Sequence, residues 1–210
     1  MFESVRLAGK RRIAPYVVCL ALSAVGLVSA QQDRDVRPKV SDQPFTAEQI
    51  AVYRALLTSW YEGDKAAINL AIQTDPIDRN DDSFDKTCLK GLILEKMKAA
   101  EVHRFRSEDL TPLGFANLRL VDPEIQAKEV RDNDPGKAIL DGKSVDDDVD
   151  NGIAHGLFTL GEIHFDKNHT HALVQYRSWC GMLCGHGSTM LLKKKDGVWM
   201  RKKQCGGWQS

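Results

Sequence analysis

Three stretches near the C-terminus constrain the fold most, because each has the composition of a β-strand. Residues 172–180, 188–195 and 198–204 are rich in apolar, β-branched and aromatic side chains and contain no glycine or proline. Between the last two stand Asp196 and Gly197, a pair that accepts the positive φ angles of a two-residue type I′ turn. The C-terminal part of the chain is therefore predicted to form two consecutive β-hairpins.

The turn sets the pairing expected in the last hairpin, whereas the first hairpin is less determined. Five cross-strand pairs are predicted: Lys195 with Val198, Lys194 with Trp199, Leu192 with Arg201, Met190 with Lys203, and Ser188 with Cys205. The connection of the first hairpin, 181–187, contains three glycines. With Cys180 opposite Cys184, one end of the sheet would gather Cys180, Cys184, His186 and Cys205, but a one-residue slip would scatter them.

The first thirty residues have the pattern of a secretory signal peptide. A basic run, Lys10-Arg11-Arg12, precedes the uncharged and mostly apolar stretch 13–30, which ends in Val28-Ser29-Ala30. Small residues at the last and third-last positions suit signal peptidase, so cleavage after Ala30 is predicted. The alternative is an uncleaved membrane anchor, because an apolar stretch of this length nearly spans a bilayer. We expect export to the periplasm or the extracellular space.

Removal of this signal would leave 180 of the 210 residues, enough for one domain with its own core. The signal carries four basic residues and one acidic residue, so its loss changes the formal charge from 0 to −3. A mildly acidic chain is not expected to bind nucleic acid. Residues 31–45 are predicted as a flexible lead-in and 46–210 as a single α+β domain, with no transmembrane segment after signal cleavage.

Four cysteines remain outside the signal: Cys88, Cys180, Cys184 and Cys205. An even number in an exported protein indicates disulfide bonds, and four cysteines allow three connectivities. We favour Cys180–Cys184, which would close the loop of the first hairpin. Cys88–Cys205 would then tie the middle of the chain to the last strand.

An amphipathic helix is predicted near the start of the domain. Thr46 and Gln49 have the spacing of a capping box, which marks a helix N-terminus. Apolar residues then recur every three or four positions as far as Gly63: Ile50, Tyr53, Leu57 and Trp60. We expect this apolar stripe to cover the C-terminal sheet.

The middle of the chain carries shorter patterns. Residues 66–74 are predicted as a strand, 92–103 as a second helix, and 110–134 as a segment that wraps the surface. Ser144, followed by acidic residues, opens a short third helix, and 157–165 form a strand. Together these elements predict an α+β fold, with an N-terminal helix or helices packed on a curved antiparallel sheet of about four strands.

The C-terminal sequence resembles a family of uncharacterised exported bacterial proteins. The resemblance covers roughly 120–210 and is carried by LVDPEIQAKEVRDNDP, SVDDDV and CGMLCGHG followed by KKKDGVWMRKKQCGGW. These proteins share the hairpin pattern CGxLCGxG…DGxW…CGGW, and their layout is similar to that of nuclear-transport-factor-like and cystatin-like domains. That fold hosts enzymes, ligand carriers and protein-binding modules, so the resemblance implies a fold but no single function.

The cysteine-rich end of the hairpins is a candidate metal site. Thiolates and an imidazole would bind zinc tetrahedrally if these four residues met: Cys180, Cys184, His186 and Cys205. The spacing is not the usual Cys-x2-Cys, and an oxidising compartment favours disulfide bonds, which we therefore prefer. Trp179, His186 and Trp208 are candidate binding residues, although a tryptophan packed on a disulfide is also a common core feature.

A second group would suit acid–base or metal chemistry. Glu162, His164 and Asp166 alternate along one predicted strand, with His169 and His171 just beyond its turn. The catalytic candidates are His164, Asp166 and His171. A solvated strand face and hairpin tip would produce the same pattern, and this is the interpretation that we favour.

The last hairpin carries six basic residues: Lys193, Lys194, Lys195, Arg201, Lys202 and Lys203. One interpretation is that they dock an anionic surface such as lipid headgroups. The other, which we favour, is that they keep an edge strand soluble. We expect an exported, disulfide-stabilised, non-catalytic domain that binds a small ligand or an envelope protein without a cofactor. The alternative is a small enzyme or metal-binding protein that uses the histidine, aspartate and cysteine residues of the C-terminal hairpins.

Overall fold

The computed structural model describes residues 38–61, 67–76, 85–95, 101–132, 156–181 and 184–210, with isolated positions between 137 and 146. All of them belong to the second of two units into which the chain divides, 36–210. The predicted signal peptide, much of the lead-in and nearly all of the helix predicted after Ser144 lie outside the described residues. No helix in the described ranges has the length and apolar character that a membrane crossing needs.

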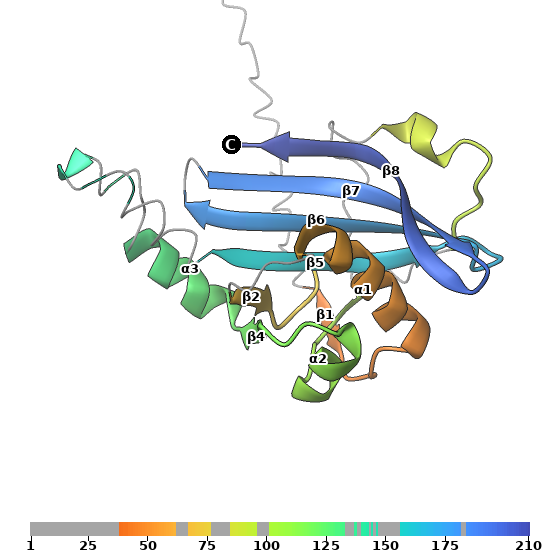
Figure 1. Ribbon diagram of the computed structural model, residues 1–210, viewed down its shortest axis with the longest axis horizontal. Coiled ribbons are helices and arrows are strands. Elements are labelled where there is room, and N and C mark those ends of the chain that lie inside the picture. The colour runs from red at the N-terminus through yellow and green to blue at the C-terminus, as the bar shows by residue number, and fades with distance from the viewer. Residues whose placement is uncertain are drawn as a thin grey trace, which may run out of the picture. The chain divides into compact units, whose positions relative to one another are not determined.

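Six strands form one mixed sheet in the described part of the chain, in the order β4-β2-β5-β6-β7-β8 (Figure 1). The strands are β2 (Ile68–Ala71), β4 (Leu118–Val121), β5 (Leu157–Phe165), β6 (His171–Gly181), β7 (Cys184–Lys195) and β8 (Val198–Gln209). Strands β5 to β8 pair antiparallel, whereas β2 runs parallel to β4 and β5. The α+β class is confirmed. The prediction of about four antiparallel strands is wrong, because β2 and β4 extend the sheet beyond β5.

A separate parallel pair joins β1 (Lys39–Ser41) to β3 (Glu101–His103). β1 lies within the stretch predicted as a flexible lead-in. β3 lies at the end of the helix predicted over 92–103, and that prediction is wrong there. Val102 is buried while its two neighbours are half-buried, which is the alternation of a strand.

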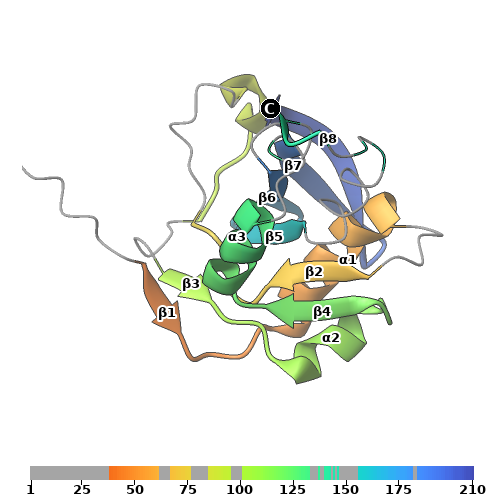
Figure 2. The ribbon, with the colours of Figure 1, turned by 90° about the vertical axis from the view of Figure 1, so that its left-hand side faces the viewer.

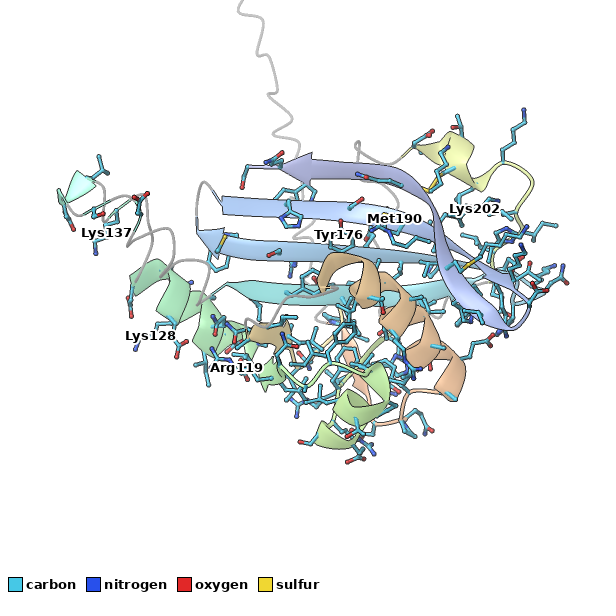
Figure 3. The ribbon with its side chains drawn as sticks, in the orientation of Figure 1. Arg119, Lys128, Lys137, Tyr176, Met190 and Lys202 are labelled. Carbon is cyan, nitrogen blue, oxygen red and sulfur yellow. A yellow bond between two sulfur atoms is a disulfide. The ribbon has the colours of Figure 1, made fainter. Side chains whose placement is uncertain are left out.

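Helix α1 (Ala47–Tyr61) begins at the predicted capping box. The backbone N–H of Thr46 donates to Oε1 of Gln49 (2.8 Å), and the backbone N–H of Gln49 donates to Oγ1 of Thr46 (3.2 Å). The helix lies across one face of the sheet, where Tyr176 and Met190 join its core (Figures 1 and 3). The α1 residues of this core are Ile50, Val52, Tyr53, Leu56 and Leu57. Burial of each leucine stabilises the fold by roughly 1.5–3 kcal/mol.

Two further helices lie in the segment predicted to wrap the surface, so that prediction is wrong. α2 (Ser107–Leu113) begins where the backbone N–H of Arg106 donates to Oδ2 of Asp109 (2.7 Å). α3 (Pro123–Asp132) has proline at its first position, and the side chain of Asp122 accepts a hydrogen bond from its first turn. α3 packs against β5 and β6 (Figure 2). The helices are thus not confined to the N-terminal part of the domain.

The last hairpin keeps the predicted register near its turn and departs from it further along. Asp196 and Gly197 have φ angles of 51° and 83°, as a type I′ turn requires. The three predicted pairs nearest the turn are present, but two β-bulges then shift the strands. The other two predicted pairs are wrong, and the observed ones are Ser188 with Gly207 and Met190 with Gln204.

Strands β6 and β7 pair in the predicted register as far as Trp179 with Gly185, but a bulge at Cys180 then places Gly181, and not Cys180 as predicted, opposite Cys184. Alternate side chains of β6 therefore face opposite sides of the sheet. Val174 and Tyr176 lie in the core beneath α1. A second, smaller cluster on the other face contains Leu173, Leu191, Cys88 and Cys205.

Charged side chains tie the start of α1 to the turn between β5 and β6. Oε2 of Glu48 lies 2.7 Å from Nδ1 of His169, and Oε1 of Glu48 lies 2.7 Å from Nζ of Lys194. Nε2 of His169 lies 3.4 Å from Oε1 of Glu95. The hydrogen bond to Glu48 raises the pKa of His169 above its ordinary value, and this effect exceeds the lowering that partial burial causes.

We expect the stability of the fold to depend on the charge of His169. A histidine whose pKa is raised by folding contributes fully to the stability of the fold at pH values below its unfolded pKa of about 6.5. This stabilisation is lost as the pH rises through the folded pKa. Denaturant unfolding from about pH 5.5 to about pH 8.5 should show wild type losing more stability than His169→Gln. The control Asn168→Ala, at the adjacent exposed position, should follow wild type. Equal pH dependence of wild type and His169→Gln would contradict this prediction.

Candidate functional site

A cleft of about 370 Å³ lies on the sheet face opposite to α1, and we call it the sheet cleft. Its lining residues are Asp75, Pro76, Thr159, Gly161, Gln175, Tyr176, Arg177, Ser188, Thr189, Gly207 and Trp208. Thr159, Gln175 and Thr189 each stand next to a residue of the α1 core, so strand alternation directs their own side chains to the other face. Asp75 and Pro76, which follow β2, form a wall beside the sheet.

The indole of Trp208 lies against the backbone of β7 at the edge of the sheet cleft. A Cβ atom placed on Gly187 would lie 2.5 Å from Nε1 of Trp208, and one placed on Gly185 would lie 3.1 Å from Cζ3. These two glycines share one face of β7, so they leave a strip of bare backbone for the ring. Trp208 is still 41% exposed. The tryptophan therefore offers apolar aromatic surface to a ligand, and its position requires glycine at both places.

Polar side chains occupy the rest of the sheet cleft. Nη2 of Arg177 lies 2.7 Å from Oδ2 of Asp75, and Nε2 of Gln175 donates a hydrogen bond to Oγ1 of Thr189 (3.0 Å). Burial raises the pKa of Asp75, and the guanidinium of Arg177 opposes that shift. The cleft thus combines an aromatic surface with a balanced ion pair, an amide and hydroxyl groups.

A second cavity, of about 470 Å³, is lined by residues of β6, β7 and β8 alone. The sheet cleft has an additional wall at Asp75 and Pro76, so it is the better enclosed of the two. Among the predicted binding residues, Trp208 lines both cavities and His186 lines the second. Trp179 lies on β6 and lines neither of them. The sheet cleft is therefore the candidate site.

The predicted catalytic residues His164, Asp166 and His171 do not line the sheet cleft. Asp166 accepts hydrogen bonds from the backbone N–H groups of Thr170 (2.7 Å) and His171 (2.8 Å), so it caps the turn between β5 and β6. Burial raises the pKa of Asp166, but these hydrogen bonds outweigh it and leave the pKa below its ordinary value. Nδ1 of His171 lies 3.4 Å from Oδ2 of Asp166, whereas His164 is buried opposite Leu173.

Glu162 belongs to a buried hydrogen-bonded group that sequence reasoning missed. Its carboxylate accepts hydrogen bonds from the hydroxyl of Thr74 and from the backbone N–H of His103 (2.8 Å). Both carboxylate oxygens also lie 3.0 Å from Nδ1 of His103. The partners are 88 and 59 residues away from Glu162, so no local pattern signals this contact. The group ties β3 and the end of β2 to β5.

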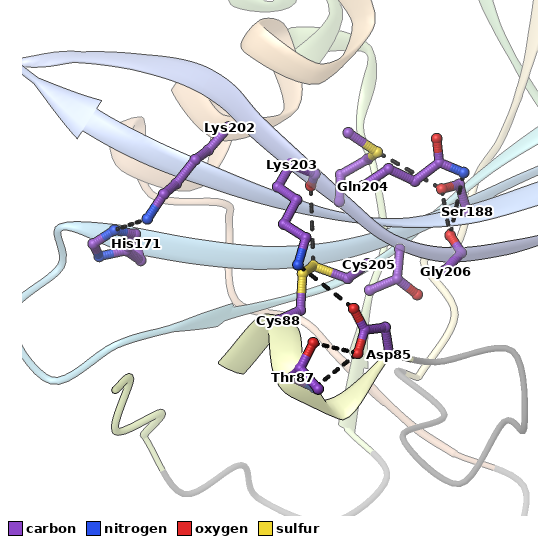
Figure 4. Close-up of a disulfide and its surroundings, with 12 residues drawn as sticks. Asp85, Thr87, Cys88, His171, Ser188, Lys202, Lys203, Gln204, Cys205 and Gly206 are labelled. Carbon is purple, nitrogen blue, oxygen red and sulfur yellow. Dashed lines mark hydrogen bonds and ion pairs between the residues drawn. A yellow bond between two sulfur atoms is a disulfide. The ribbon is translucent and has the colours of Figure 1, made fainter. Parts of the chain in front are cut away.

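Cys88 and Cys205 form the predicted disulfide bond (Figure 4). Cys88 lies in the short 3-10 helix η1 (Lys86–Leu89). Beside the bond, the backbone N–H of Asp85 donates to the carbonyl oxygen of Cys205 (2.7 Å), and Nζ of Lys203 lies 3.5 Å from Oδ2 of Asp85. The segment that contains η1 is thereby fastened over the face of the sheet opposite to α1.

His186, another member of the predicted metal cluster, does not meet Cys205. The side chain of Cys205 lies on the face away from α1, whereas the ring of His186 lies beside Tyr176, 6.1 Å between centroids, on the α1 side. Cys180 is also disulfide-bonded, and the side chain of its predicted partner Cys184 lies outside the described residues. Within the part of the chain that is described, no three His, Cys, Asp or Glu side chains are grouped to hold a metal ion.

Comparison of the chain with protein-family models, with curated proteins and with solved structures found no match. The resemblance to exported bacterial proteins therefore stays a prediction. The chemistry of the sheet cleft is what indicates a function.

Proposed function

We propose that the protein is an exported, non-catalytic domain that binds a short, uncharged saccharide in the sheet cleft. The observation that carries this proposal is the position of Trp208 beside hydrogen-bonding side chains on one face of the sheet. The volume of about 370 Å³ also falls in the range of small-molecule sites in proteins.

A saccharide has an apolar face of C–H groups and a rim of hydroxyl groups, and the sheet cleft offers a partner for each. The aromatic surface of Trp208 suits the apolar face. The amide of Gln175 and the hydroxyl of Thr189 both donate and accept hydrogen bonds, as sugar hydroxyls do. Because Asp75 and Arg177 neutralise one another, the cleft favours a ligand without net charge.

Binding rather than catalysis is proposed because the two charged side chains of the cleft are engaged with each other. Asp75 and Arg177 form an ion pair, and the described lining residues include no histidine, cysteine or lysine. A general acid or base has to reach the proton that it transfers. The catalytic candidates His164, Asp166 and His171 stand outside the cleft lining, so the cleft does not support the enzyme alternative.

Export is proposed on two grounds. The stretch 1–30 has the pattern of a cleaved secretory signal. The bond between Cys88 and Cys205 is of a kind that persists in the periplasm or outside the cell rather than in the cytosol.

Calorimetric titration with maltose, cellobiose and N,N′-diacetylchitobiose tests the proposed function. We expect wild type to bind at least one of them, and Trp208→Ala to weaken binding by about tenfold or more, because an aromatic contact is lost. Trp208→Phe keeps an aromatic ring and should retain more affinity than the alanine variant. Met200→Ala changes an exposed residue outside the cleft lining and serves as the control.

Two results would overturn the proposal. Absence of binding to all three sugars would remove the saccharide assignment. Equal affinity of wild type, Trp208→Ala and Gln175→Ala would place the site elsewhere.

A further inference from the structure

The end of the β7–β8 hairpin carries an exposed surface that the sheet cleft does not use. We define the basic tip as three lysines and two apolar residues: Lys193, Lys195, Val198, Met200 and Lys202. Val198 is 62% exposed and Met200 is 45% exposed. Figure 1 shows this end of the hairpin beside the turn between β5 and β6, and Figure 3 shows Lys202 near it.

Strand pairing puts the lysines and the apolar residues of the basic tip side by side. Lys193 lies opposite Met200, and Lys195 lies opposite Val198. Trp199, between the two apolar residues, belongs to the core beneath α1. The neighbours of Trp199 on β8 therefore face away from α1, together with their partners on β7.

Lys202 joins the same face through a bulge in β8. Its Nζ atom lies 3.3 Å from Nε2 of His171, and His171 lies opposite Lys193 (Figure 4). Among the described residues, no ion pair within 4.0 Å joins a carboxylate to any of the three lysines of the basic tip.

The remaining lysines of the hairpin are neutralised. Lys194 lies 2.7 Å from Glu48, and Lys203 lies 3.5 Å from Asp85. Of the five lysines of the hairpin, the three of the basic tip are thus the ones that no described carboxylate pairs with, although the whole chain has a formal net charge of 0.

We infer that the basic tip docks on a membrane surface that carries anionic lipid headgroups. Lysines beside exposed apolar side chains are typical of segments that lie in the headgroup region, because the charges meet the phosphates while the apolar groups enter the acyl boundary. Protection of an edge strand accounts for lysines but not for Val198 and Met200. A soluble polyanion likewise gives these two side chains nothing to contact.

Sedimentation of the purified protein with vesicles tests the inference. We expect binding to vesicles of equal parts phosphatidylglycerol and phosphatidylcholine, and little binding to phosphatidylcholine alone. Charge reversal at all three lysines, Lys193→Glu/Lys195→Glu/Lys202→Glu, should weaken binding by at least about 100-fold, since loss of each lysine near an anionic surface costs about fivefold and each new glutamate adds repulsion. Val198→Ser/Met200→Ser should weaken it as well.

The control is Lys39→Glu/Lys90→Glu/Lys128→Glu, which makes the same change in net charge at exposed lysines outside the basic tip. It should leave vesicle binding within a few-fold of wild type, and circular dichroism checks that both triple variants are folded. Equal weakening by the two triple variants would overturn the inference, and so would equal binding to both kinds of vesicle. Binding to soluble polyphosphate but to neither kind of vesicle would overturn it too, because the partner would then be a polyanion.

Discussion

Replacement of both Cys88 and Cys205 with alanine should lower the free energy of unfolding by about 4–5 kcal/mol. The two cysteines are 117 residues apart in the sequence, and the chain entropy that a cross-link removes from the unfolded state grows with loop length. The bond also holds the segment of η1 over Leu173 and Leu191, which are buried in the second cluster. Its loss would leave that face of the sheet less well covered.

Urea unfolding of wild type and of Cys88→Ala/Cys205→Ala, both without reductant, measures this effect. The control is Lys90→Ala, an exposed position just after η1, which should change the free energy of unfolding by less than about 0.5 kcal/mol. A loss below about 1 kcal/mol in the double variant would show that the disulfide does not hold the fold together.

Replacement of Glu162 with alanine should have the second largest effect, a loss of about 3 kcal/mol. The carboxylate is buried and accepts hydrogen bonds from Thr74 and from the backbone of His103. Its removal breaks both of these charge-assisted hydrogen bonds and also takes away the carboxylate that lies 3.0 Å from Nδ1 of His103, a loss that is costly in a buried site. Glu162→Gln keeps an acceptor oxygen and should lose less, about 1–2 kcal/mol.

Thermal and urea unfolding of both Glu162 variants checks this expectation. Glu108→Ala provides the matched control, because Glu108 is an exposed glutamate that forms an ion pair with Arg106 at 3.6 Å and, within the described structure, with no other residue. It should change stability by less than about 0.5 kcal/mol. If Glu162→Ala were no more destabilising than Glu108→Ala, the buried group would not be what joins β3 to β5.

Local patterns predict α1 and the two hairpins because the determining residues lie within a few positions of one another. Thr46 and Gln49 cap α1, and Asp196 with Gly197 sets the last turn. The bulges of β8 have no such local signal. They turn the side chain of Cys205 toward Cys88, a residue that the chain brings close only after folding.

The short parallel strands escape prediction for a related reason. β3 and β4 have three and four residues, too few for periodicity to show. β4 is held in the sheet by its parallel pairing with β2, in which Leu120 lies opposite Leu70. The start of α3 is different, because Asp122 followed by Pro123 is a helix N-terminus signal that the sequence did contain.

The candidate site was predictable only in part. The sequence singles out Trp208. Asp75, however, lines the cleft only because β2 pairs with β5, and this pairing is not apparent from the sequence. The sequence signal that was available is the alternation of Gly185 and Gly187, which leaves space for a ring on one face of β7. A β-bulge between Leu160 and Ile163 likewise breaks the simple alternation assumed for the histidine and acid residues of β5.

The most direct test of the proposed function is chemical-shift mapping by nuclear magnetic resonance. Isotope-labelled protein is titrated with whichever of the three disaccharides binds in calorimetry. We expect the indole N–H of Trp208, the side-chain amide of Gln175 and the backbone N–H of Thr189 to shift with a common saturation curve, while the basic tip stays unchanged. Shifts confined to residues outside the sheet cleft, with Trp208 unaffected, would contradict the assignment of this cleft as the binding site.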